Sequence, residues 1–141
     1  LYSPQMQCTI SASWTTKMHD NYRFYNRRPD GKIEEDCVCR AISTATRLRY
    51  GAVQKLLRIS AGINKCDKLC VCCYKYLLED ILGYEPRYCR SEATVADIAA
   101  AYPERIVLIR IDGHLTCSAM GVILDIWDCT EEPADRYWII T

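Results

Sequence analysis

The chain has 141 residues, 18 lysines and arginines against 18 aspartates and glutamates, and 10 cysteines. This length suits one domain that buries a core without cross-links, so we expect a single domain over 1–141 in which 1–35 form an arm packed on the rest. A formal net charge of +0 gives no field to attract nucleic acid, and no apolar run is long enough to cross a bilayer, so neither is expected as a partner.

The cysteine content is the unusual feature of the composition. It would suit a secreted disulfide scaffold, but the chain opens without a charged and then apolar signal segment. Several cysteines also fall at core-like spacing: Cys66, Cys70 and Cys73 recur at i, i+4 and i+7, and Leu77 continues the row. We therefore interpret them as thiols that pack in a reducing compartment, the cytoplasm.

The first 35 residues are polar and aromatic without clear periodicity. Trp14, Tyr22, Phe24 and Tyr25 stand in this arm, which ends in a run of loop-forming residues at 26–31. The arm is predicted to pack on the domain.

A helix is predicted over 37–49, ended by Gly51. Its apolar residues recur at 38, 41, 42, 45 and 48, which places Cys37 and Arg40 off the buried stripe, near the exposed start of the helix. A helix N-terminus favours the thiolate form of a cysteine, so Cys37 is where a nucleophile would lie.

Further helices are predicted over 52–60 and 67–82, separated by a break at Gly62, and a short one after the N-cap Thr94, with Asp97 in the capping-box position. From 105 onward the pattern changes to β-branched and apolar runs, which predict strands over 106–111, 114–120, 122–127 and 137–140. Helices followed by an antiparallel sheet indicate an α+β fold.

A nucleophilic cysteine needs a base and a group that orients the base. The chain has two histidines, and we favour His114, at the start of a strand, over His19, in the arm. A two-residue turn at 120–121 would pair 119 with 122, which puts Asp125 on the face of His114, about 7–8 Å away at the backbone. A turn of odd length would favour Asp128 instead, so Asp128 is the reserve orienting acid.

Three motifs carry a resemblance: Asp36-Cys37-x-x-Arg40-Ala41-Ile42, then Gly113-His114, then Asp125-x-Trp127-Asp128. They resemble a family of small papain-like proteins often encoded by bacteriophages and mobile elements of gut Firmicutes. The resemblance covers about residues 25–138 and implies a papain-like cysteine peptidase core. It also implies a nucleophile at Cys37, a general base at His114 and an orienting acid at Asp125. The chain departs from the family at Glu35, where glycine is usual, and at Cys39, which adds a second thiol.

Papain-like enzymes also need donors for the oxyanion, by analogy with their glutamine or asparagine side chain. Asn26 is the nearest upstream amide, although it lies eleven residues before Cys37. The backbone N–H of Cys37 is the alternative donor. Trp127 is a candidate substrate-binding residue, or else a core aromatic. Arg40 could bind a carboxylate, or form a local surface ion pair with Asp36.

No cofactor and no metal are expected. A zinc site is the alternative for the cysteines at 66, 70, 72 and 73, because thiolates suit this ion. Structural zinc sites usually combine two separated pairs, whereas these four fall within eight residues of a predicted helix, on which Cys72 would point away from the others. The spacing therefore favours packing.

The preferred function is a cysteine-dependent hydrolase, a peptidase or isopeptidase, that acts on a protein or peptide in the cytoplasm of a host cell. One alternative is a catalytically idle interaction module that binds or inhibits a host protein, suggested by the aromatic arm. Another is acyl transfer through the same thioester. The oligomeric state stays open.

Overall fold

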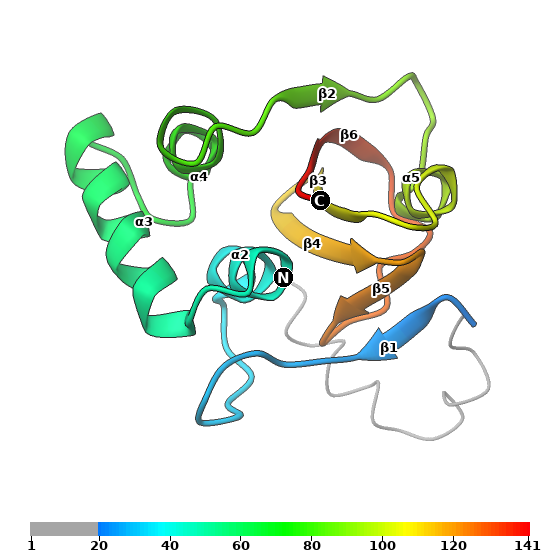
Figure 1. Ribbon diagram of the computed structural model, residues 1–141, viewed down its shortest axis with the longest axis horizontal. Helices are drawn as coiled ribbons and strands as arrows, with labels where there is room; N and C mark the ends of the chain where they lie inside the picture. The colour runs from blue at the N-terminus through cyan, green and yellow to red at the C-terminus, as the bar shows by residue number, and fades with distance from the viewer. Residues whose placement is uncertain (1–19) are drawn as a thin grey trace.

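The structure is a computed structural model that describes residues 20–141. Its elements surround one six-stranded sheet in the order β1-β5-β4-β3-β6-β2, which Figure 1 shows. The strands are β1 (Tyr22–Phe24), β2 (Pro86–Tyr88), β3 (Ile106–Ile111), β4 (His114–Ala119), β5 (Val122–Asp125) and β6 (Ala134–Ile139). The helices are α2 (Cys37–Thr46), α3 (Tyr50–Asn64), α4 (Val71–Tyr76), which continues into the π-helical turn η2 (Leu77–Ile81), and α5 (Val95–Ala101).

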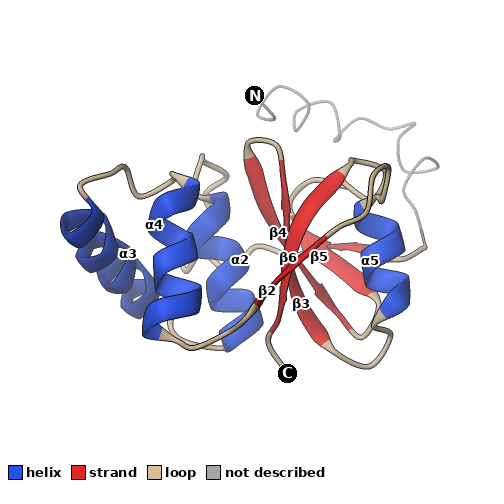
Figure 2. Ribbon diagram, turned by 90° about the horizontal axis from the view of Figure 1, so that it is seen from above, coloured by secondary structure: helices blue, strands red, loops and turns tan. Residues whose placement is uncertain are grey.

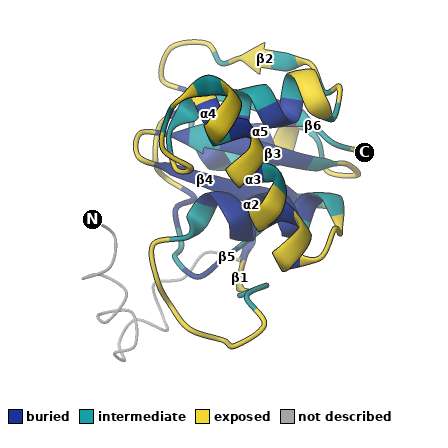
Figure 3. Ribbon diagram, turned by 90° about the vertical axis from the view of Figure 1, so that its left-hand side faces the viewer, coloured by how far each residue is buried: buried dark blue, intermediate teal, exposed yellow. Residues whose placement is uncertain are grey.

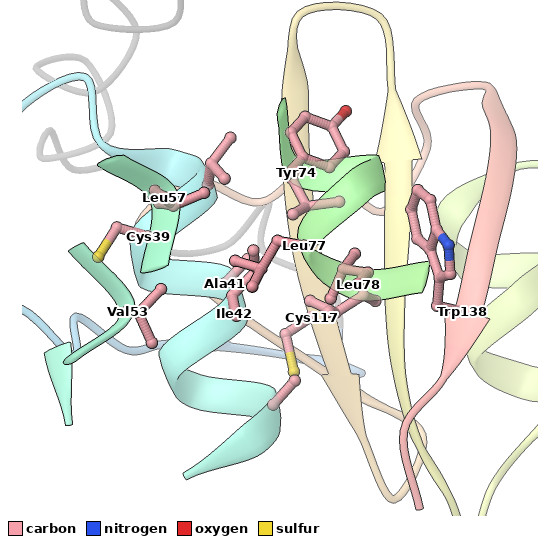
Figure 4. Packing of buried hydrophobic residues seen from close by; sticks show 14 of the residues in the cluster. Cys39, Ala41, Ile42, Val53, Leu57, Tyr74, Leu77, Leu78, Cys117 and Trp138 are labelled. Carbon is pink, nitrogen blue, oxygen red and sulfur yellow. The ribbon is translucent and has the colours of Figure 1, made fainter. Parts of the chain in front are cut away.

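Helices cover both faces of the sheet. Figure 2 shows α2, α3 and α4 on one side and α5 on the other. Each side has its own core. The core under α2 to α4 includes Ile42, Leu78 and Trp138, of which Figure 4 shows the packing, and the core under α5 includes Val107 and Ile123. The predicted α+β class is confirmed, and no described helix is long and apolar enough to cross a membrane.

Helix α2 begins at Cys37, as predicted, and its apolar stripe faces the sheet. Val38, Ala41 and Ile42 are buried, and Figure 3 shows this buried face of α2 against the sheet. The predicted end was wrong, because Arg47 adopts the left-handed conformation with φ of 67° and stops the helix at Thr46. A residue other than glycine occupies the capping position here, so no glycine marks this helix end.

The next two helices also differ from their predicted bounds. Gly62 does not break α3, which runs on to Asn64 and ends where Lys65 takes φ of 55°. The segment 65–70 is a turn, so α4 begins only at Val71. Thr94 and Asp97 do form the predicted capping box at the start of α5.

Two short strands were missed. β1 pairs in parallel with β5, and β2 pairs antiparallel with β6 at the far edge, so the predicted antiparallel sheet holds for β3 to β6 and is extended by a strand at each edge. Both missed strands have three residues, too few for an alternating pattern to stand out.

The hairpin between β4 and β5 has the predicted two-residue turn. Met120 and Gly121 have φ of 53° and 82°, which is typical of a type I′ turn. Ala119 therefore pairs with Val122, and the register prediction is confirmed.

Candidate active site

Cys37 is the first residue of α2 and follows the N-cap residue Asp36. Its side chain is half-buried and lines a pocket of about 220 Å³. His114 lines the same pocket, together with Tyr74, Arg110 and the apolar residues Val38, Leu69 and Val71. The structure therefore brings the predicted nucleophile and the predicted base to one cavity, although they lie 77 positions apart in the chain, from 37 to 114.

His114 begins β4 directly after Gly113, whose φ of 74° turns the chain between β3 and β4. Its ring is buried, and Nε2 lies 2.7 Å from Asp125 Oδ2. Burial alone lowers the pKa of His114, but the Asp125 charge and the hydrogen bond to it raise this pKa well above its usual value. Hydrogen bonds with the thiols of Cys129 and Cys37 raise it further. Since Nε2 donates to the carboxylate, Nδ1 is the nitrogen that can exchange a proton with a thiol.

Asp125 ends β5 and is almost fully buried. Three nitrogen and oxygen donors converge on its carboxylate, beside the more distant thiol of Cys129. Oδ2 accepts hydrogen bonds from His114 Nε2 and, at 2.6 Å, from Thr116 Oγ1, and Oδ1 accepts one at 2.7 Å from the backbone N–H of Ile126. Burial raises the pKa of Asp125, but His114 and Thr116 outweigh it, so the pKa is lowered overall. The carboxyl group is therefore held as a charged acceptor that fixes the imidazole.

Asp128, the reserve acid, has a different structural role. Its Oδ1 accepts hydrogen bonds from the N–H of Thr130 at 3.2 Å and from the Thr130 hydroxyl at 2.8 Å, which stabilises the turn after β5. The two-residue turn at 120–121 puts Asp125, and not Asp128, on the face of His114, and Asp125 is the acid that bonds to it.

Trp127 packs its ring against the imidazole of His114, with centroids 5.0 Å apart and an interplanar angle of 69°. It is not among the residues that line the pocket with Cys37. Trp127 lies beside the buried hydrogen bond between His114 and Asp125. This position suits a role in excluding water from that bond more than a role in binding substrate.

Asn26 is not brought to the pocket. Its Nδ2 donates to the carbonyls of Gly31 and Lys32, at 3.2 and 3.0 Å, and its Oδ1 accepts from the N–H of Arg28. The amide therefore closes the 26–32 loop instead of facing Cys37, and the oxyanion prediction for this residue is wrong in this geometry. The backbone N–H groups at the start of α2 remain the donors that the fold offers.

Arg40 corrects a second prediction, because it is buried, with 4% of its surface exposed, and not at the exposed start of the helix. It forms an ion pair with Asp36, and its Nη1 donates to the Glu34 carbonyl at 2.9 Å. Asp36 also accepts hydrogen bonds from the Tyr50 hydroxyl and from Arg28. This network holds the loop that precedes Cys37. The predicted ion pair between Arg40 and Asp36 is therefore present, but it is buried and not at the surface.

Two neighbouring thiols differ from Cys37 in environment. Cys39 is buried and its thiol lies 3.5 Å from the Tyr50 carbonyl, and burial raises its pKa to about 11. Cys129 is fully buried with Sγ 3.8 Å from Asp125 Oδ2, and burial raises its pKa to about 11 as well. Both thiols are held protonated at neutral pH, whereas Cys37 opens onto the pocket.

Two groups of described residues have ligand atoms close enough to share a metal ion. The first consists of His114, Asp125 and Cys129, whose atoms are engaged in the hydrogen bonds described above. The second consists of Cys66 and Cys70, in the turn before α4, and Cys72, in the first turn of α4. Cys72 does not point away from the other two as predicted, because Cys66 and Cys70 lie in a turn and not on the expected helix.

No family model, no curated protein and no solved structure matches this chain. The geometry described above is therefore the basis for any statement about function, and the papain-like resemblance stays a prediction.

Thr116 and Tyr22 contact Asp125, and sequence reasoning assigned neither of them to the site. The register that selected Asp125 also places Thr116 opposite it, since pairing 119 with 122 pairs 116 with 125, so this residue could have been found. Tyr22 donates its hydroxyl at 2.9 Å to the Asp125 carbonyl, and it depends on β1, which no pattern indicated. His19 and Trp14 lie outside the described residues.

Proposed function

We propose that the chain is a cysteine-dependent hydrolase that cleaves an amide bond, in a peptide or an isopeptide, through a thioester on Cys37. The observation that carries the proposal is that Cys37 and His114 line one pocket while Asp125 holds the far nitrogen of the imidazole. Nucleophile, base and orienting acid are the three parts that such chemistry needs.

In the proposed mechanism, His114 Nδ1 accepts the proton of the Cys37 thiol, and the sulfur attacks the carbonyl carbon of the substrate. Backbone N–H groups at the start of α2 stabilise the oxyanion. When the C–N bond breaks, the imidazolium returns its proton to the leaving amine. Water then attacks the thioester with His114 again as base, and the carboxylic acid leaves with Cys37 regenerated as the thiol. Asp125 stays charged throughout and keeps the proton of His114 on Nε2.

The pocket also indicates what a substrate can place beside Cys37. Its apolar wall is formed by Val38, Leu69 and Val71, and Arg110 contributes a guanidinium that is paired with Asp135 and bonded to the Tyr74 hydroxyl at 3.1 Å. A mainly apolar side chain next to the scissile carbonyl suits the wall of Val38, Leu69 and Val71, while the exposed Glu35 also lines the pocket. We propose a protein or peptide as the substrate and the cytoplasm of a host cell as the location.

The proposal is tested by limiting alkylation of the folded protein with iodoacetamide across pH, with the labelled residue located by mass spectrometry. We expect Cys37 to react first, at a pH at which Cys89 is still unreactive, because an imidazole that accepts the thiol proton promotes the nucleophilic form. In His114→Ala this advantage should disappear. If Cys37 reacts no faster than Cys89 at any pH in the wild-type protein, that result alone refutes the hydrolase proposal.

Turnover is tested on a library of peptides carrying a fluorogenic amide. Cys37→Ala should abolish hydrolysis, and Cys39→Ala is the matched control, two residues along the same helix but buried and facing the Tyr50 carbonyl. Adding an amine acceptor distinguishes hydrolysis from acyl transfer, since a transferase yields the new amide in place of the free acid.

A second candidate function, an idle interaction module, is favoured by one observation. Phe24 and Tyr25 are exposed, at 57% and 39%, on and directly after the edge strand β1. Exposed aromatic side chains at an edge suit a protein partner. If Phe24→Ser abolishes a biological effect that Cys37→Ala leaves intact, the interaction module replaces the hydrolase.

A further inference from the structure

The turn between α3 and α4 and the first turn of α4 carry three thiols that the proposed reaction does not use. The sulfur atoms of Cys66, Cys70 and Cys72 all lie within 4.8 Å of one another, and those of Cys70 and Cys72 are 3.3 Å apart. Cys66 packs against the edge of the core, whereas Cys72 is exposed and Cys70 is half-buried outside that cluster. Core packing therefore does not explain why Cys70 and Cys72 are cysteines.

The backbone of this turn is fixed by its own hydrogen bonds. The N–H of Cys66 donates to the Ala61 carbonyl at 3.1 Å, and that of Cys70 to the Asp67 carbonyl at 3.0 Å. The Asp67 side chain accepts from the N–H of Leu69 at 2.8 Å, and Lys65 closes α3 in the left-handed conformation. The three thiols are thus held together by the fold itself, which lowers the entropic cost of binding one ion with all three.

We propose that Cys66, Cys70 and Cys72 bind one thiophilic cation, of which Zn²⁺ is the representative, with the fourth coordination position open to solvent. Zinc bonds thiolates at about 2.3 Å in a tetrahedron, which puts sulfur atoms about 3.8 Å apart. The observed separations, from 3.3 Å to at most 4.8 Å, bracket this value. The spacing between Cys66 and Cys70 also falls within the two to four residues usual between zinc ligands.

The fourth position is assigned to solvent because of the neighbouring thiol. Cys73 follows Cys72 directly, but it is fully buried and its Sγ lies 3.3 Å from the Leu57 carbonyl on α3. The exposed side of the site is at Cys72. When Zn²⁺ binds, the three thiols release three protons to solvent, and the resulting complex carries a single negative charge. The exposed side chains of Lys65 and Lys68 in the same turn offset this charge.

The ion would join the end of α3 to the start of α4 across the turn. Leu69 and Val71 belong to the same segment, and both line the pocket with Cys37. Metal binding would therefore stiffen one wall of that pocket without touching the thiol of Cys37. The metal site itself does not depend on the hydrolase proposal, since none of its ligands takes part in the proposed reaction.

The test is metal content after reconstitution of the full chain with Zn²⁺ under reducing conditions and removal of excess ion. We expect one zinc per chain in the wild-type protein and in Cys89→Ser, and none in Cys72→Ser, an exposed change that leaves the core untouched. Replacement by Co²⁺ should give the intense visible absorption of a tetrahedral thiolate site. In the wild-type protein, bound Zn²⁺ should protect Cys66, Cys70 and Cys72 from alkylation while Cys89 remains as reactive as before.

Two outcomes would overturn the proposal. If zinc is retained in Cys72→Ser and lost in Cys129→Ser, the ion lies at His114 and Asp125. If no zinc binds and mild oxidation removes two hydrogen atoms to join Cys70 to Cys72, the cluster is a redox pair. Neither result depends on turnover, so failure of the metal site and failure of the hydrolase are distinguished.

Discussion

Replacing Asp125 by asparagine tests the centre of the proposed site with one changed atom. The carboxylate accepts hydrogen bonds from three nitrogen and oxygen donors, His114 Nε2, Thr116 Oγ1 and the N–H of Ile126. An asparagine has one oxygen and one NH₂ group, so in either orientation it directs its NH₂ at a donor. If the oxygen faces His114, the NH₂ meets the backbone N–H of Ile126. If the amide is flipped, it meets His114 and Thr116.

The cost follows from the burial of the residue. Leaving a buried donor unsatisfied costs about 1–3 kcal/mol, and losing the charge opposite His114 adds about 1.5–3 kcal/mol. We therefore expect the free energy of unfolding at pH 6 to fall by about 3–5 kcal/mol, the usual range for breaking a buried ion pair by removing one partner. For a chain of this length the corresponding decrease in Tm is about 10–15 °C.

The assay is urea unfolding followed by circular dichroism, with Asp128→Asn as the matched control. Asp128 is half-buried and accepts hydrogen bonds from Thr130, so its replacement should cost about 1 kcal/mol. Labelling of Cys37 should slow in Asp125→Asn and stay unchanged in the control. If the two variants lose equal stability, the convergence of three donors on a charged Asp125 is refuted.

Three further predictions follow from the same contacts. Because folding raises the pKa of His114 and lowers that of Asp125, their contribution to stability should be complete between about pH 4 and 6.5. This contribution should decrease as pH rises toward the raised pKa of His114 and as pH falls toward the lowered pKa of Asp125. Urea titrations at several pH values measure it. In Asp125→Asn the dependence of stability on pH should be weaker. Arg40→Lys keeps the charge but loses the fork that binds the loop before Cys37, so we expect a loss of about 1–3 kcal/mol and slower labelling of Cys37, with the helix content unchanged by circular dichroism. Thr116→Val removes one donor to Asp125 at nearly constant volume, so stability should fall by about 1 kcal/mol and the apparent pKa of His114, followed by NMR, should rise as the carboxylate relies more on the imidazole.

The parts of the site that sequence could predict depend on local geometry. A turn of two residues sets the register of a hairpin by counting, so the neighbourhood of His114 and Asp125 followed from the positions of Met120 and Gly121. The start of α2 at Cys37 followed from the period of its apolar residues. Both inferences use contacts within one element or between adjacent strands.

The incorrect predictions depended on backbone choices that side-chain patterns do not encode. Arg47 and Lys65 adopt left-handed conformations that are more usual for glycine. The predicted ends of α2 and α3 were therefore wrong, as was the predicted helix break at Gly62. The turn that Lys65 begins places Cys66 and Cys70 outside any helix, so that with Cys72 in α4 they form a cluster and not a packing row. One misplaced helix end therefore altered the chemical interpretation of three residues.

Arg40 shows why burial of a charge is difficult to infer from periodicity. Its helical position predicted exposure, yet a guanidinium can be buried when fixed acceptors surround it, and here these are the Asp36 carboxylate and the Glu34 carbonyl. Those acceptors belong to an irregular loop that no period describes. The loop and Arg40 thus depend on each other, and together they determine how Cys37 is presented to the pocket.

The site consequently combines supports of different kinds. The bond between His114 and Asp125 lies in a hairpin between two cores, where strand pairing and Trp127 hold it, whereas Cys37 depends on a loop held by buried charges. A third support is the segment 65–72 with its three thiols, in which Leu69 and Val71 line the pocket. Perturbing the hairpin should therefore change the acid–base behaviour of His114, perturbing the loop should change the reactivity of Cys37, and perturbing the turn should change which side chains the pocket accepts. Because the Cys37 thiol interacts with His114 and the Arg40 charge acts on Asp125, variants of the hairpin and of the loop should combine non-additively in their effect on stability.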